Sequence, residues 1–196
     1  MKQLFKKSLE KSIRYTDYRK LVSNLLEKGK STGTMQSEDL LNYSKLNVAR
    51  MHRLDLKTIL TDETISALKA VNRPQTWLVI TEGWCGDAAQ ILPVLNTMSL
   101  VNEHIDFRIV LRDENPELMS QFLTNGSMSI PILLLLNDAY ELMGSWGPRP
   151  SIATQMVQDY KATHGGLDAE FKKELQVWYN KDKGQSIQKD LIGLID

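Results

Sequence analysis

Residues 77–93 read Trp77-Leu-Val-Ile-Thr-Glu-Gly-Trp-Cys85-Gly-Asp-Ala-Ala-Gln-Ile-Leu-Pro93, and this stretch decides the fold. Residues 76–81 are mainly β-branched and aromatic, which predicts a buried strand there, and a glycine turn follows them. Cys85 then stands where a helix is expected over 85–98. Unpaired amides and the dipole at a helix N-terminus stabilise a thiolate, whereas the nearby acids Glu82 and Asp87 oppose it. The sequence therefore marks Cys85 as a candidate nucleophile and leaves the balance of these effects open.

Further strands follow this first unit along the chain. A second apolar run, residues 105–111, comes after the helix, and the strand, helix, strand order favours parallel pairing through a right-handed crossover. Asn115-Pro116-Glu117 then predicts a capped helix that continues to residue 123. Residues 130–136 predict another buried strand, with residues 141–143 as its hairpin partner and a loop over 144–150. Together these segments predict a mixed sheet.

The rest of the chain has helical spacing. Apolar residues recur at helical intervals over 8–28, 38–53 and 61–71, and again over 151–160 and 168–179. We therefore expect three parts: a helical extension over 1–74 packed on the core, a core over 75–160, and a C-terminal helical extension over 161–196.

The composition excludes several classes of protein. The 196 residues are 42% hydrophobic and 24% charged, an ordinary globular balance. Lys plus Arg equals Asp plus Glu at 24 each, so no overall field attracts nucleic acid, which we exclude as a partner. No apolar segment predicts a signal peptide or a membrane span, so we expect no membrane association. A single cysteine cannot form an internal disulfide, and we expect a reducing cytoplasm.

Several short motifs give a family resemblance. Trp84-Cys85-Gly86-Asp87 resembles the Trp-Cys-Gly-Pro-Cys active site of thioredoxins, and Pro93 matches the proline that kinks their active-site helix. Asp113-Glu114-Asn115-Pro116 is similar to their Asp-x-Asn-Pro, Ser129-Ile130-Pro131 to their cis-proline loop, and Gly147 to the glycine of their substrate groove. The Trp-Cys-Gly-Asp-Ala variant, together with the helical extension, resembles a bacterial thioredoxin-like subgroup.

The resemblance implies an α/β thioredoxin fold, a central mixed sheet flanked by helices, with N-terminal and C-terminal helical extensions. It also implies a cis bond at Pro131 and a substrate backbone held at Ile130. Three departures matter. Ala88 replaces the resolving cysteine, which excludes an internal dithiol cycle. Val79 replaces a buried aspartate that assists proton transfer, and Ile132 replaces the usual threonine.

The leading hypothesis is monothiol thiol–disulfide chemistry by a catalytic Cys85. In this hypothesis a protein thiol or disulfide partner, or a small thiol such as glutathione, supplies the resolving sulfur. The expected substrate-binding residues are Trp84, Gly86, Asp87, Ile130, Pro131 and Gly147. The alternative is a non-catalytic thioredoxin-fold module that binds a protein partner. Peroxide reduction is disfavoured because the Pro-x-x-x-Thr/Ser-x-x-Cys pattern is absent.

Each of these residues also has a structural interpretation. Cys85 can be a small buried hydrophobe, and Asp87 can simply stabilise the first turn of its helix. Trp84 and Trp146 can rim a groove or belong to the core. The lysines near residues 172 and 181 are interpreted as solvated helix faces. No cofactor is expected, and no metal site either, since His52, His104 and His164 lack zinc-like spacing with Cys85.

Overall fold

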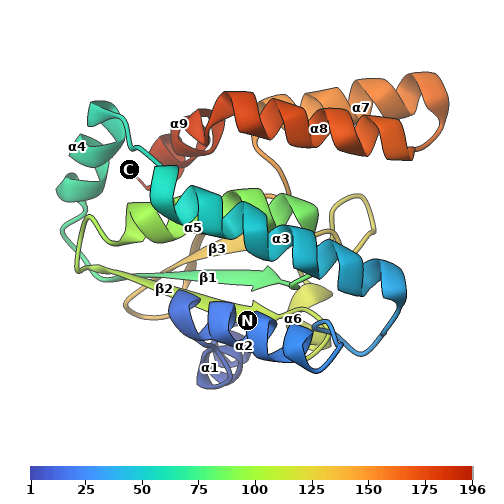
Figure 1. Cartoon of the computed structure of the whole chain (residues 1–196). Coiled ribbons are helices and arrows are strands. Elements are labelled where there is room, and N and C mark those ends of the chain that lie inside the picture. The colour runs from blue at the N-terminus through green and yellow to red at the C-terminus, as the bar shows by residue number, and fades with distance from the viewer. Residues whose placement is uncertain (196) are drawn as a thin grey trace.

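The computed structural model describes residues 1–195 (Figure 1). The strands of these residues form one sheet, and the helices pack around it. Their bounds, in chain order, are α1 (Lys2–Glu10), α2 (Tyr15–Glu27), α3 (Glu38–Lys57), α4 (Asp62–Ala70), β1 (Gln75–Thr81), α5 (Gly86–Ser99), β2 (Ile105–Leu111), α6 (Pro116–Met119), β3 (Ile132–Asn137), β4 (Leu142–Trp146), α7 (Ser151–His164), α8 (Ala169–Asp182) and α9 (Gln185–Ile195).

The sheet has the mixed topology that the sequence predicts. Its strand order is β2-β1-β3-β4, and β1 pairs in parallel with β2 and antiparallel with β3. Val79, in the middle of β1, lies opposite Ile109 on one side and Leu133 on the other. A central strand that is buried on both faces must be apolar throughout, and Leu78, Val79 and Ile80 are fully buried. The predicted thioredoxin fold is confirmed.

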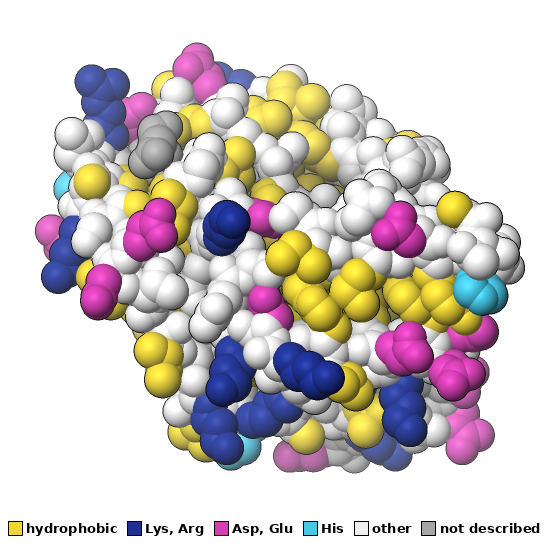
Figure 2. Space-filling model, turned by 90° about the horizontal axis from the view of Figure 1, so that it is seen from above, with side chains coloured by type: hydrophobic (Ala, Val, Ile, Leu, Met, Phe, Trp, Pro, Cys, Tyr) yellow, Lys and Arg dark blue, Asp and Glu magenta, His cyan; other side chains and the backbone are white. Residues whose placement is uncertain are grey.

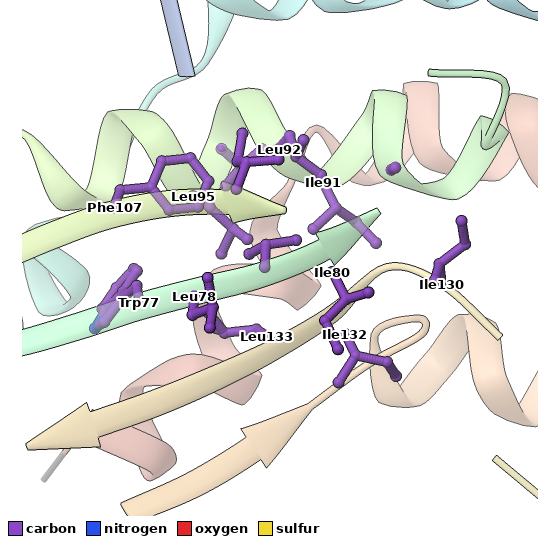
Figure 3. Packing of buried hydrophobic residues seen from close by; sticks show 14 of the residues in the cluster. Trp77, Leu78, Ile80, Ile91, Leu92, Leu95, Phe107, Ile130, Ile132 and Leu133 are labelled. Carbon is purple, nitrogen blue, oxygen red and sulfur yellow. The ribbon is translucent and has the colours of Figure 1, made fainter. Parts of the chain in front are cut away.

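Helix α5 packs directly on β1 and carries Cys85 at its start. Figure 3 shows Ile91, Leu92 and Leu95 pointing from α5 toward the strands of the sheet, and all three side chains are fully buried. Burial of a leucine or isoleucine side chain contributes about 2 kcal/mol to stability. Because β1 and α5 both belong to the core, the short turn between them holds Cys85 on a rigid support.

The N-terminal and C-terminal helices enclose this core. In Figure 1, α1 and α2 lie on the opposite side of the sheet from α5. Helix α3 packs along α5, and α8 lies farther from the sheet than α5, on the same side. Ile13 joins the edge of β2, since its backbone N–H and C=O each bond Ile109 at 2.9 Å. A single hydrophobic cluster includes Tyr18, Trp77 and Leu175, one from each predicted part. The division at residues 74 and 160 stays a prediction.

Some predicted boundaries were wrong. Helix α6 ends at Met119 instead of continuing to residue 123. Asn115 stands at the N-cap position, but its side chain makes no capping hydrogen bond and donates instead to the Leu111 carbonyl at 2.9 Å. β4 extends to Trp146, inside the predicted loop, where Trp146 pairs with Leu133 of β3. Among residues 1–195 no helix is long and apolar enough to cross a membrane.

Candidate functional site

Cys85 lies between the start of α5 and the loop before β3. Its Sγ accepts a hydrogen bond from the Ala88 amide at 3.4 Å and donates one to the Ile130 carbonyl at 3.3 Å. The next peptide bond, Ile130–Pro131, is cis. Only 7% of Cys85 is exposed. Two segments that are 45 residues apart in the sequence thus meet at the sulfur, in the arrangement that the motifs predict.

Gly147 supports this loop from behind. Its φ is +124°, and a Cβ added there would lie 2.3 Å from the Pro131 carbonyl oxygen. Both features require glycine, because an L side chain would be strained and would collide with backbone. Trp146 points elsewhere, since its indole N–H donates to Asp190 of α9 at 3.1 Å. Trp84 stays at the site, half-buried, with the Arg112 guanidinium 4.8 Å from its ring centroid.

Asp87 is buried in the first turn of α5, and both of its carboxylate oxygens have partners. Its two carboxylate oxygens accept hydrogen bonds from the Tyr179 hydroxyl at 2.9 Å and from the Arg149 guanidinium at 2.8 Å. Burial raises the pKa of the Asp87 carboxyl, and the positive charge of Arg149 partly offsets that rise. Asp87 therefore connects the helix start to α8 and to the loop after β4.

The Cys85 thiol is shifted away from ionisation. Burial raises its pKa to about 12, and the charge of Asp87 adds to the rise, while hydrogen bonds from the Ala88 and Asp87 amides oppose it. The thiol is therefore protonated at neutral pH. The sequence left open the balance between the helix N-terminus and the nearby acids; burial, which that balance did not include, raises the pKa most, and the charge of Asp87 adds to it.

The turn before Cys85 is held by the N-terminal part of the chain. The Gly83 amide donates to the Thr32 hydroxyl at 2.7 Å, and the Asn47 side chain donates to the Gly83 carbonyl at 2.9 Å. Glu82 is fully buried and accepts a hydrogen bond from the Asp113 amide at 3.0 Å. Thr32 and Asn47, which both precede β1 in the chain, thus hold the N–H and the C=O of Gly83. No sequence motif indicated this role.

A cavity of about 590 Å³ opens beside the thiol, and we call it the Cys85 cavity. Six segments form its wall: α3, the turn from Trp84 to Asp87, Arg112 after β2, the loop before Pro131, Arg149 after β4, and α8 with Leu167 before it. Apolar side chains and cations share this wall. The principal lining residues are Leu40, Tyr43, Arg50, Trp84, Cys85, Gly86, Asp87, Arg112, Met128, Ile130, Arg149, Phe171, Lys172, Lys173 and Leu175.

The predicted site residues divide into two groups. Trp84, Cys85, Gly86, Asp87 and Ile130 line the cavity, whereas Pro131 and Gly147 lie behind the loop that carries Ile130.

Sequence reasoning missed Arg50, Arg149 and Phe171. Lys172 and Lys173 are exposed, as the sequence predicts, but they also line the cavity. Arg50 comes from α3, Arg149 from the loop after β4, and the other three from α8, so only the tertiary packing brings them to Cys85. Within residues 1–195 no cluster of three His, Cys, Asp or Glu side chains could hold a metal ion.

Comparisons with known proteins agree with this fold. The family model described as thioredoxin matches residues 33–161. A crystallised protein of unknown function from Pseudomonas aeruginosa has a TM-score of 0.60 at 22% identity, over 76% of this chain and 84% of that one. A crystallised HIV epitope-scaffold has a TM-score of 0.58 at 18% identity, over 88% and 96%. No curated protein matches the chain. With the family model covering most of the molecule, including α3 and the Cys85 site, the chain belongs to the thioredoxin-like family.

Proposed function

We propose that this thioredoxin-like protein is a non-catalytic binding module that holds its ligand in the Cys85 cavity. The observation that carries this proposal is the state of the thiol. Cys85 is 7% exposed, bonded to the Ile130 carbonyl, and has a pKa raised to about 12. A resting nucleophile needs an accessible thiolate, and this environment favours the thiol form.

The residues around the thiol support the same proposal. Ala88 supplies no resolving sulfur, and the fully buried Val79 supplies no proton carrier. The wall still has the features of a binding site, because aromatic and aliphatic side chains of Trp84, Ile130 and Phe171 enclose a volume suited to a small ligand. The proposed location is the cytoplasm, because a lone cysteine suits a reducing compartment.

The second candidate is monothiol thiol–disulfide exchange, which one observation favours. Cys85 forms part of the cavity wall, so a disulfide that enters the cavity reaches the sulfur. After loss of its proton to solvent, Cys85 would attack a disulfide R–S–S–R′, forming Cys85–S–S–R and releasing R′S⁻. An external thiolate such as that of glutathione would then attack the R sulfur of this mixed disulfide and displace Cys85 as a thiolate, which takes up a proton and becomes the protein thiol again. The disulfide is the oxidant and the external thiol is the reductant.

Incubation with oxidised glutathione at pH 7.5 separates the two candidates. The intact mass reports a mixed disulfide, and reduction of bis(2-hydroxyethyl) disulfide by glutathione reports turnover. We expect no adduct on the folded wild type and no turnover above that of Cys85→Ser. Turnover that depends on Cys85 would overturn the binding-module proposal and support the monothiol route.

A further inference from the structure

The wall of the Cys85 cavity carries more positive than negative charge. Five cations and one carboxylate line it. Two of the cations are neutralised, since Arg149 pairs with Asp87 and Arg112 pairs with Asp113, both at 2.8 Å.

The other three cations are Arg50 from α3 and Lys172 and Lys173 from α8. None of them forms an ion pair with a carboxylate of residues 1–195. Lys172 and Lys173 are exposed and Arg50 is half-buried, so the excess positive charge lies at Arg50 and along the open side of the cavity, although the chain as a whole is neutral.

Arg50 is the best placed of these cations. Its Nη1 donates only to the neutral Asn47 side chain, at 2.9 Å, and the guanidinium is half-buried. A Cβ added at Gly86 would lie 3.5 Å from Nη1, so the guanidinium sits next to the start of α5. Burial and the nearby charge of Arg53 lower the pKa of Arg50. A bound anion would relieve this unpaired charge and would also face the positive end of the α5 dipole.

Most of the remainder of the wall is apolar, and Ser129 and Gln176 are its neutral polar residues. Leu40 and Tyr43 come from α3, Phe171 and Leu175 from α8, and Trp84 from the turn before Cys85. Figure 2, which shows the molecule from above, has a band of hydrophobic side chains with both Lys or Arg and Asp or Glu side chains around it. The volume of about 590 Å³ lies in the range that encloses a small organic molecule.

We propose that the Cys85 cavity binds a small amphiphilic organic anion, with the acid group at Arg50, Lys172 and Lys173 and the apolar body against Trp84 and Phe171. The inference rests on the proposed function, because it names the ligand class of the same cavity. It does not require the thiol to react. A purely apolar ligand would leave the three cations unpaired, and an inorganic anion would leave the apolar wall uncovered.

Two matched dyes test this inference on the full chain. The probe is 1-anilinonaphthalene-8-sulfonate, and its neutral partner is N-phenyl-1-naphthylamine, which lacks the sulfonate. Fluorescence titrations give the Kd of each dye for the wild type, for Arg50→Gln and for the double variant Lys172→Gln/Lys173→Gln. The controls are Arg73→Gln and the double variant Lys161→Gln/Lys181→Gln, which remove equal charge from exposed positions outside the cavity.

We expect the Kd of the sulfonate dye to rise about tenfold in each cavity variant, the size of one lost charged hydrogen bond. The Kd of the neutral dye for the cavity variants, and the Kd of both dyes for the control variants, should stay within about twofold of the wild-type values. A twofold change is well below the loss expected from one charged hydrogen bond. Unchanged binding of the neutral dye also shows that each variant is folded. Equal weakening of both dyes, equal loss in the controls, or wild-type affinity in the cavity variants would each overturn the inference.

The oxidised-glutathione assay, run beside the dye titrations, separates this inference from the proposed function, because dye binding does not require the thiol to react. A reactive thiol with retained, charge-dependent dye binding would therefore defeat the proposed function alone. An inert thiol with charge-independent dye binding would defeat the inference alone.

Discussion

The protonated state of Cys85 predicts slow alkylation and a specific response to Asp87→Asn. Its pKa rises from an ordinary value near 9 to about 12. The thiolate fraction at neutral pH is then lower by about 1,000-fold, while the greater intrinsic nucleophilicity of a more basic thiolate recovers about 20-fold. We therefore expect the folded protein to react with iodoacetamide about 50-fold more slowly than the urea-unfolded chain.

Asp87→Asn removes the charge that, after burial, does most to raise the pKa of Cys85. It also frees Arg149 to stabilise a thiolate. The variant should react faster than wild type at pH 8 but more slowly than the unfolded chain, since burial still raises the pKa of the thiol. Asp138→Asn, an exposed acid in the β3–β4 turn, is the control and should react like wild type.

Intact-mass kinetics between pH 6 and pH 10 measure these rates. The wild-type rate should still be rising at pH 10. A rate that levels off near pH 7.5, or an Asp87→Asn variant no faster than wild type, would refute the reasoning. A plateau at low pH identifies an activated thiol even where access to the sulfur is slow.

Three further substitutions test the framework of the site by urea unfolding. Gly147→Ala should lower the free energy of unfolding by about 2–5 kcal/mol, because the new Cβ would collide with the Pro131 carbonyl and because alanine is strained at the positive φ of this position. A loss below about 1 kcal/mol would contradict this. The buried Oε2 of Glu82 has no hydrogen-bond partner, and burial raises the pKa of its carboxyl. The folded state therefore favours the protonated form. The free energy of unfolding of the wild type should fall as the pH rises from about 4.5, the unfolded pKa, through the folded pKa. Glu82→Gln should flatten that fall and be more stable by about 1–3 kcal/mol at pH 7.5, and parallel pH profiles of the two proteins would argue against it. Asn47→Ala leaves the Gly83 carbonyl unpaired and should cost about 1–3 kcal/mol, with faster hydrogen exchange in the turn, whereas unchanged exchange there would count against the assigned role.

The strands show how far local sequence carries the fold. The apolar run at 105–111 matches β2 without error, and the run at 76–81 misses only the first residue of β1. β1 is buried along nearly its whole length, and β2 has half-buried charges only at Asp106 and Arg108, so their apolar and β-branched residues mark both strands without knowledge of their neighbours. The limits of α6 and β4 were less predictable. The Asn115 side chain donates a hydrogen bond to the carbonyl of the preceding Leu111, and Trp146 pairs with Leu133 of β3. Both outcomes depend on the folded partner that each residue contacts.

The sequence was enough to predict the thioredoxin fold, the meeting of Cys85 with the Ile130–Pro131 loop, and the lack of a second cysteine at position 88. The first two follow from the motifs that resemble thioredoxins, and the third from residue identity, which no packing can alter. Tertiary structure alone decided the state of the thiol and the charge of the cavity. Burial in a low-dielectric wall and the contact with Asp87 set the pKa of Cys85, and α3 and α8 bring Arg50, Lys172 and Lys173 beside it. The opening motif thus located the site, and distant helices determined its chemistry.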